Sequence, residues 1–129
     1  MMRSADDELS VCDVQTDGIA EVTLYQGVGA AIVQISGEID LANVATLRAA
    51  LNAAVTSGSR RVLVDLAAVS FLDVTGADAL AAAAQTVSRD DRRQFTVINP
   101  SGPAQRVLTA TGADRLIIVS PVQPAAPAS

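Results

Sequence analysis

The chain lacks three residue types on which much enzyme chemistry depends: it contains no histidine, no lysine and no tryptophan. Without histidine there is no imidazole general base, no imidazole ligand for zinc and no Ser-His-Asp triad. Without lysine, the phosphate-binding loop, a Schiff base and the protein-kinase signature are all excluded. The composition therefore predicts a protein that is not an enzyme and that holds neither a metal nor a cofactor.

Cysteine and aromatic residues are also scarce. The lone cysteine, Cys12, cannot form a disulfide within the chain, so nothing indicates an oxidising compartment. The aromatic residues are Tyr25, Phe71 and Phe95, although half of the 129 residues are hydrophobic. The core must therefore consist of Ala, Val, Leu and Ile, which suits short buried strands covered by alanine-rich helices.

The chain also lacks an excess of basic charge and a long apolar run. The net charge of −5 argues against a nucleic-acid surface, which needs a basic stripe. The most apolar stretch, residues 77–87, contains Asp78, Gln85 and Thr86 and falls short of the roughly 20 residues of a membrane span. No apolar segment follows the N-terminal Arg3, so a signal peptide is not expected. We expect a cytoplasmic protein that binds neither membrane nor nucleic acid.

Composition along the chain predicts one domain with two tails. Residues 1–17 are polar and acidic, which predicts a flexible N-terminal arm. Residues 121–129 are rich in proline and alanine and predict a C-terminal tail. The folded domain is expected over residues 18–120.

Within the domain, hydrophobic periodicity predicts an α/β fold. Residues 19–25 alternate and are followed, after Gly27 and Gly29, by the apolar run 31–35, which predicts an antiparallel hairpin. The remaining elements alternate between helix and strand: helix 41–55, strand 61–66, a helix from Thr75, strand 95–98, a helix after Ser101 and strand 116–119. This order predicts a mixed sheet whose right-handed crossovers place the helices on one side.

The turn from Asp73 to Asp78 is the first candidate site. Thr75 and Asp78 have the spacing of a capping box, in which the hydroxyl is the N-cap of the following helix. An ordinary helix cap explains these residues without any function. The alternative is a docking or anion site, because the start of a helix presents free N–H groups and partial positive charge.

Two other clusters of charged residues are explained without a functional role. Glu38 and Asp40 invite an acid/base hypothesis, but they lie at a strand–helix boundary, where Asp40 is expected to cap the helix beginning near Leu41 while Glu38 is solvated. Asp90 and Asp91 neutralise most of the charge of the arginines at 89, 92 and 93, so residues 89–93 are expected to form a solvated loop.

Four segments, taken together and in order, resemble the STAS domain of bacterial anti-sigma factor antagonists. They are residues 37–40 (Gly-Glu-Ile-Asp), the strand 62–66, residues 71–76 (Phe-Leu-Asp-Val-Thr-Gly), and residues 99–101 with 108–112. The resemblance implies binding to an anti-sigma factor that is a serine/threonine kinase with a histidine-kinase-like ATP-binding fold, which frees a sigma factor for transcription. It also implies that phosphorylation after the Asp of the turn stops binding and that a phosphatase restores it.

The resemblance assigns the partner-binding residues, and the chain departs from the family at one of them. The implied docking residues are Ser36, Glu38, Asp40, Asp73, Val74, Thr75, Gly76 and Asp78. Val74 occupies the position of the phosphorylated residue but has no hydroxyl, which leaves Thr75 as the alternative acceptor. We expect Val74 to be an apolar contact at the centre of the interface.

Two further possibilities remain open. The three prolines of residues 121–129 exclude the family's C-terminal helix, so part of the sheet is expected to be uncovered and available to a partner or a second copy of the chain, as in a homodimer. The alternative function is a ligand-sensing or scaffolding STAS module that binds a nucleotide or small anion at the helix start after Asp73.

Overall fold

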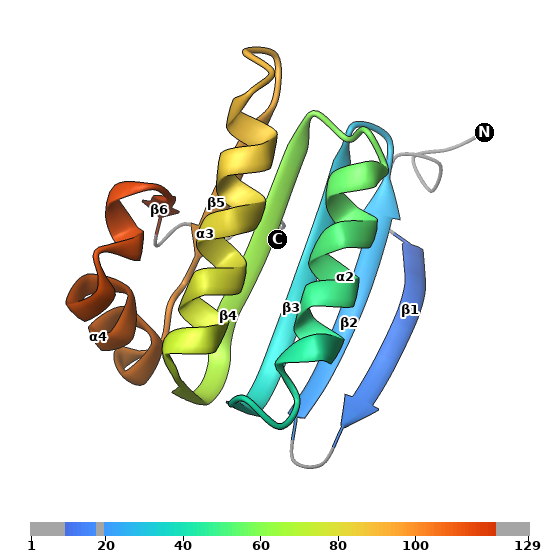
Figure 1. Cartoon of the computed structure of the whole chain (residues 1–129). Helices are drawn as coiled ribbons and strands as arrows, with labels where there is room; N and C mark the ends of the chain where they lie inside the picture. The colour runs from blue at the N-terminus through green and yellow to red at the C-terminus, as the bar shows by residue number, and fades with distance from the viewer. Residues whose placement is uncertain (1–9, 18–19, 121–129) are drawn as a thin grey trace.

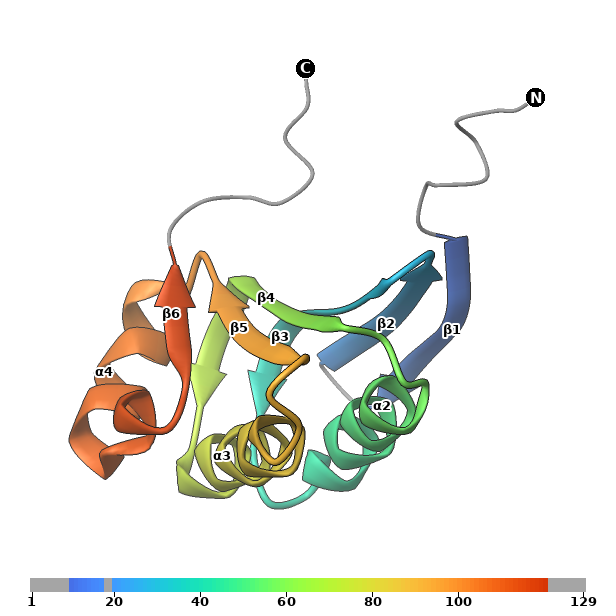
Figure 2. The same cartoon turned by 90° about the horizontal axis from the view of Figure 1, so that it is seen from above.

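A six-stranded sheet with helices on one face forms the domain (Figures 1 and 2). The computed structural model describes residues 10–17 and 20–120. The strands are β1 (Ser10–Asp17), β2 (Ala20–Gly27), β3 (Ala30–Ile39), β4 (Arg61–Leu72), β5 (Gln94–Ile98) and β6 (Ile118–Ser120). The helices are α2 (Val44–Thr56), α3 (Val74–Ser88) and α4 (Gly102–Thr111), followed by the short 3-10 helix η1 (Ala113–Arg115).

The strands lie in the sheet in the order in which they occur in the sequence. β1, β2 and β3 pair antiparallel, whereas β3, β4, β5 and β6 pair parallel, with α2, α3 and α4 as the successive crossovers. Crossovers between parallel strands are almost always right-handed, so successive helices fall on the same face of the sheet. The predicted fold class, a mixed sheet with a leading hairpin and helices on one side, is confirmed.

The main core lies between the sheet and its helices. Fully buried aliphatic side chains fill it, including Ile35, Leu47, Leu66 and Leu80. Along β4, the alternate residues Val62, Val64 and Leu66 reach this core, while Leu63 is buried on the opposite face with Ile32 and Ile98. At residues 62–64 the central strand is therefore buried on both faces, as its continuous apolar run predicts.

The predicted hairpin is formed by β2 and β3. Val22 and Leu24 are buried while Glu21 is exposed, which is the expected alternation. Gly29 has φ +76°, a left-handed conformation that glycine adopts without strain, and it makes the turn possible.

Several predicted boundaries are wrong, two of them by six residues or more, and the strand predicted over residues 116–119 is β6, Ile118–Ser120. Residues 10–17 of the expected flexible arm form β1, which pairs with β2 along its whole length. An edge strand is held by backbone hydrogen bonds, so its polar sequence carries little apolar signal. β4 runs on to Leu72, six residues beyond its predicted end, because it continues to pair with the long strand β3. Residues 1–9 and 121–129, and with them the expected tail and absent helix, lie outside the described residues, as does the Cys12 side chain.

No helix in the described ranges is both long and apolar enough to cross a membrane.

Candidate docking surface

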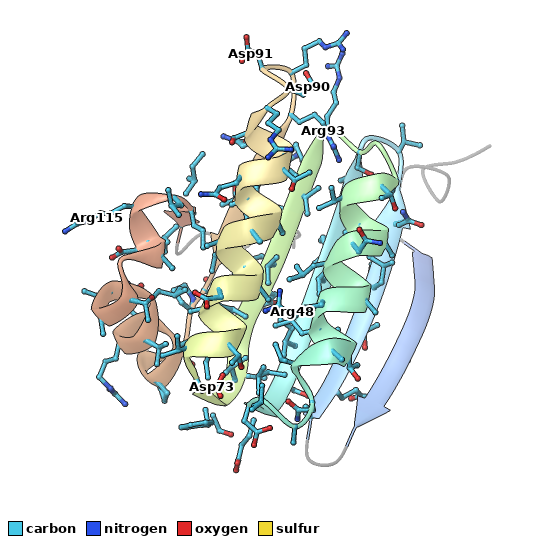
Figure 3. The ribbon with its side chains drawn as sticks, in the orientation of Figure 1. Arg48, Asp73, Asp90, Asp91, Arg93 and Arg115 are labelled. Atoms are coloured by element: carbon cyan, nitrogen blue, oxygen red, sulfur yellow. The ribbon has the colours of Figure 1, made fainter. Side chains whose placement is uncertain are left out.

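The two segments predicted to bind a partner, residues 36–40 and 73–78, meet at one end of the sheet. β3 and β4 are parallel neighbours, and their last residues, Ile39 and Leu72, lie opposite each other. The backbone N–H of Asp73 then donates to the carbonyl oxygen of Ile39 at 3.1 Å. Asp73 lies at the foot of α3, at the carboxyl end of these strands (Figure 3). The parallel register therefore places both segments side by side, although more than thirty residues separate them in sequence.

Asp73 is the N-cap of α3. Its backbone is extended, with φ −99° and ψ −176°, and its carboxylate accepts the N–H of Gly76 at 3.1 Å and the hydroxyl of Thr75. The predicted capping box with Thr75 as N-cap is therefore wrong. The helix already begins at Val74, so Thr75 lies in its first turn and its hydroxyl supports the cap instead of forming it.

The electrostatics of the Asp73 carboxyl reflect this network. Burial raises its pKa, but hydrogen bonds from the Thr75 hydroxyl and from the backbone N–H groups of Gly76, Thr75 and Leu41 outweigh burial and hold the pKa below its usual range. The Asp73 carboxylate is therefore charged at neutral pH. Through its backbone N–H, which donates to the Ile39 carbonyl, Asp73 also joins α3 to the end of β3.

That loop forms a tight turn before α2. The Asp40 carboxylate accepts a hydrogen bond from the N–H of Ala42 at 2.9 Å. The side-chain amide oxygen of Asn43 accepts one from the N–H of Asp40, also at 2.9 Å. Asn43 also donates to the carbonyl of Glu38 at 2.9 Å. α2 begins at Val44, later than predicted, with Asn43 at its N-cap position. Asp40 thus holds the turn and does not cap a helix at Leu41, while Glu38 is exposed as expected.

Three large apolar side chains are exposed at this end. Leu41 is 75% exposed, Val74 56% and Phe71 47%. Leu41 follows β3, Phe71 lies near the end of β4 opposite Glu38, and Val74 opens α3. Apolar side chains bordered by carboxylates are typical of a protein–protein contact, in which a dry centre is surrounded by a polar rim. We call Leu41, Phe71 and Val74 the apolar triad.

Sequence reasoning found Val74 but missed Leu41 and Phe71 as surface residues. The sequence predicts Leu41 within a helix over residues 41–55, but the helix begins only at Val44. Phe71 could have been found: it precedes Leu72 in a strand, and adjacent strand residues point to opposite faces, so both cannot enter the same core. Leu72 is buried, and Phe71 is outside.

The remaining predicted residues do not all reach the surface. Asp78 is exposed on the first turns of α3. Gly76 is buried, and a side chain there would collide with Leu72. The close approach that Gly76 permits is therefore internal, between α3 and β4. Ser36 is half-buried and lies three residues before Ile39, about 10 Å back along β3.

Within the described part of the chain, no three Asp, Glu, Cys or His residues are grouped so that they could hold a metal ion.

The fold and the paired loops define a known class. The sequence model of the STAS domain matches residues 20–126, and the chain belongs to the STAS domain family. Over 94 residues it is 31% identical to the anti-sigma-F factor antagonist RsfB of Mycobacterium tuberculosis, a match that covers 73% of this chain and 75% of RsfB.

Solved structures agree with this assignment. An anti-sigma factor antagonist from Mycobacterium paratuberculosis is 29% identical with a TM-score of 0.67, covering 92% of this chain and 91% of that one. The anti-sigma factor antagonist SpoIIAA in its unphosphorylated form shares the fold, with 18% identity, a TM-score of 0.63 and coverage of 76% and 86%. The Bacillus SpoIIAA has also been solved in a phosphorylated form.

Proposed function

We propose that the chain is an anti-sigma factor antagonist that binds an anti-sigma factor through the apolar triad and the carboxylates around it. The observation that carries this proposal is the exposed apolar triad at the place where β3 and β4 end, in a chain 31% identical to RsfB. The partner would be an anti-sigma factor with a histidine-kinase-like ATP-binding fold, and its capture would free a sigma factor. On this proposal the chain acts by binding and catalyses no reaction.

Regulation at this turn would differ from that of phosphorylated relatives. Val74 offers no oxygen that could accept a phosphate. The Thr75 hydroxyl is half-buried and donates to the Asp73 carboxylate. A phosphate on Thr75 would place about two negative charges beside that carboxylate and would break the cap of α3. We infer that binding is not switched off by phosphorylation of Thr75, the one hydroxyl-bearing residue of residues 73–78, and that no phosphatase acts here.

The docking surface is tested with Val74→Asp. A charge at the centre of a dry contact must lose its water without gaining a partner, so we expect the affinity to fall at least about tenfold. Val28→Asp is the matched control, because Val28 is 76% exposed at the opposite end of the sheet. Binding is measured by calorimetry with each histidine-kinase-like anti-sigma factor of the same genome, and circular dichroism verifies folding. Equal affinity of both variants would remove the apolar triad from the interface.

The missing switch is tested by co-elution on a sizing column with ADP and then with ATP, followed by intact mass measurement. We expect a complex that persists in ATP and a chain of unchanged mass. A complex lost in ATP, with one phosphate on Thr75, would overturn the inference about regulation while retaining the docking surface. Absence of a complex with every candidate would contradict the proposed function itself.

A further inference from the structure

The end of the domain opposite the apolar triad is basic, although the chain as a whole carries −5. Arg60 and Arg61 lie where β4 begins, and Arg92 and Arg93 precede β5. Because β4 and β5 are parallel neighbours with Arg61 opposite Gln94, both arginine pairs reach the same edge of the sheet. Figure 3 shows Arg93 at this end, opposite to Asp73. Sequence reasoning judged the arginines of residues 89–93 neutralised, since it had no reason to add Arg60 and Arg61.

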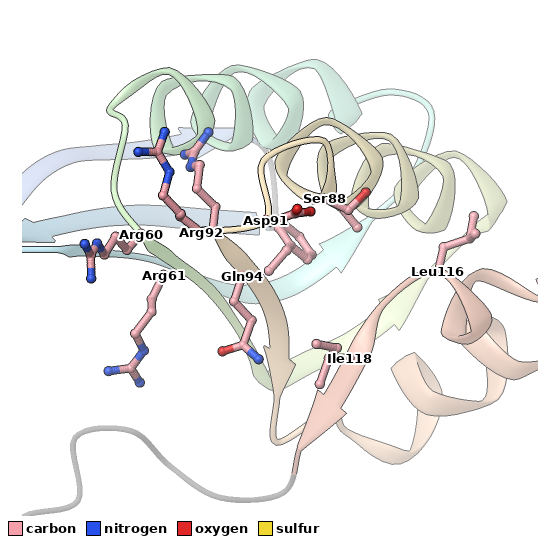
Figure 4. Close-up of a pocket in the computed structure, with 11 residues that line it drawn as sticks. Arg60, Arg61, Ser88, Asp91, Arg92, Gln94, Leu116 and Ile118 are labelled. Carbon is pink, nitrogen blue, oxygen red and sulfur yellow. The ribbon is translucent and has the colours of Figure 1, made fainter.

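A hollow of about 530 Å³ opens at this end (Figure 4). The four arginines line it together with a single carboxylate, that of Asp91, and the polar side chains of Ser88 and Gln94. Its volume lies within the range of about 300–1,000 Å³ that is typical of small-molecule sites.

The four arginines are not equivalent. Arg93 is occupied by the fold, because its guanidinium donates to the carbonyls of Ser59 at 2.9 Å and Val55 at 2.8 Å. Arg92 contacts Asp90 at 3.4 Å in an exposed ion pair. Among the described residues, Arg60 and Arg61 take part in no ion pair, and Figure 4 shows their side chains extended outward from the rim. These two are free to turn onto a ligand.

The other wall of the hollow is apolar. Leu116 and Ile118 are half-exposed, and the buried side chains of Phe95 and Ala84 also line the hollow. Beyond Arg61 and Ile118 a second hollow of about 320 Å³ continues onto the sheet face without helices, where Leu63 and Ile98 line it. A ligand that follows this path would meet arginines first and aliphatic side chains next.

We propose that this basic hollow binds an amphiphilic organic phosphate, with the anionic group held by the arginines of its rim, Arg60 and Arg61, once their side chains turn toward it, and the aliphatic body on Leu116 and Ile118. The guanidinium fork matches phosphate oxygens and forms charge-assisted hydrogen bonds with them. An anion at the Asp73 end would instead face the carboxylates of Glu38, Asp40, Asp73 and Asp78. The basic hollow therefore replaces the helix start after Asp73 as the proposed anion site.

The probe is hexyl phosphate, titrated into the ¹⁵N-labelled chain and followed by amide chemical shifts, with inorganic phosphate and hexanol as the two halves of the ligand. We expect shifts at residues 60–61, 92–94 and 116–118, and affinity at least about tenfold above that of either half. The double variant Arg60→Gln/Arg61→Gln should lose at least about tenfold in affinity. Arg48→Gln/Arg106→Gln changes the net charge equally at exposed sites outside the hollow and should leave the affinity unchanged.

Three results would overturn the proposal. Chemical-shift changes confined to residues near Asp73 would place the phosphate site at that end of the sheet and not in the basic hollow. Equal affinity for hexyl phosphate and inorganic phosphate would remove the apolar wall from recognition. Sedimentation with phosphatidylglycerol vesicles, without binding of soluble hexyl phosphate, would show that the arginines recognise a lipid surface and not a free ligand.

Discussion

At the scale of single residues, Asp73 does more than cap a helix. Its carboxylate accepts hydrogen bonds from the first turn of α3, and its backbone N–H donates to the Ile39 carbonyl at the end of β3, so this residue joins the segments that carry Val74 and Leu41. The backbone of the docking surface is therefore organised before any partner arrives, which reduces the entropy lost on binding.

This role predicts a pH-dependent contribution to stability. Because the folded-state pKa of Asp73 is lowered, its carboxylate stabilises the fold above the unfolded-state pKa of about 3.9, and this contribution is lost as the pH falls through the folded-state pKa. Asp73→Ala should lower the free energy of unfolding at pH 7 by about 1 kcal/mol, the usual effect of removing an N-cap, with a smaller difference below about pH 4. Urea unfolding across pH measures it. Asp91→Ala, at an exposed site, is the control, and a difference independent of pH would contradict the assignment.

Gly76 gives a second prediction at this scale. Its position inside a helix favours alanine by about 1 kcal/mol, but a methyl group there would overlap Leu72 and press on Ile39. We expect overpacking, which costs about 1–3 kcal/mol, to outweigh the gain in helix propensity. Gly102→Ala is the control, since a Cβ at Gly102 would meet only Arg106 at 3.5 Å. Thermal unfolding of both variants tests this prediction. A Gly76→Ala chain more stable than the unmodified chain would show that the Leu72 side chain moves aside at little cost.

At the scale of elements, Arg93 ties the end of α2 to the start of β5. α2 has no basic residue in its last turn, and the guanidinium of Arg93 satisfies the Val55 carbonyl there. Arg93→Gln should lower the free energy of unfolding by about 1.5–3 kcal/mol, the usual contribution of hydrogen bonds to a charged group. Arg92→Gln removes the same charge from an exposed ion pair and should change stability by less than about 1 kcal/mol. Chemical denaturation compares the two, and equal losses would mean that the bonds of Arg93 add nothing.

Elements also show how far sequence reasoning reaches. Buried strands and helix faces repeat with their own periods, so β2, β3, β5 and the three helices were predictable in kind. β1 was not, because a polar edge strand is defined by the backbone of its neighbour. The start of α3 is hard to place from sequence because Asp73 and Thr75 are both residue types that can be the N-cap of a helix. Only the backbone conformation shows that Asp73 is the N-cap.

The docking surface and the basic hollow also differ in how far the sequence predicts them. The prediction that Val74 contacts a partner depends on the resemblance of residues 71–76 to the STAS domain, and that segment is continuous in the sequence. The basic hollow could not be predicted, since Arg61 and Arg92 meet only through the parallel pairing of β4 with β5. Residues that only strand pairing brings together are far apart in the sequence, so a single sequence shows no pattern that connects them.

At the scale of the whole molecule, charge is divided between the two ends of the sheet. Glu38, Asp40, Asp73 and Asp78 gather where β3 and β4 end, and the arginines gather where β4 and β5 begin. Such a distribution orients an approaching partner before contact and makes the acidic end complementary to a basic surface.

The charge division predicts the kinetics of association with an anti-sigma factor. Asp78→Asn removes a negative charge beside the apolar triad and should lower the association rate constant at low salt by about two- to fivefold, with little effect on dissociation, because steering acts before contact. Asp91→Asn removes the same charge from the basic end and should leave that rate unchanged. Stopped-flow measurements between 20 and 300 mM NaCl, values chosen to span Debye lengths from roughly 20 to 6 Å, should bring Asp78→Asn and the unmodified chain together as salt screens the field. Equal rates at low salt would mean that the carboxylates form a rim which does not guide the partner, leaving recognition to Leu41, Phe71 and Val74.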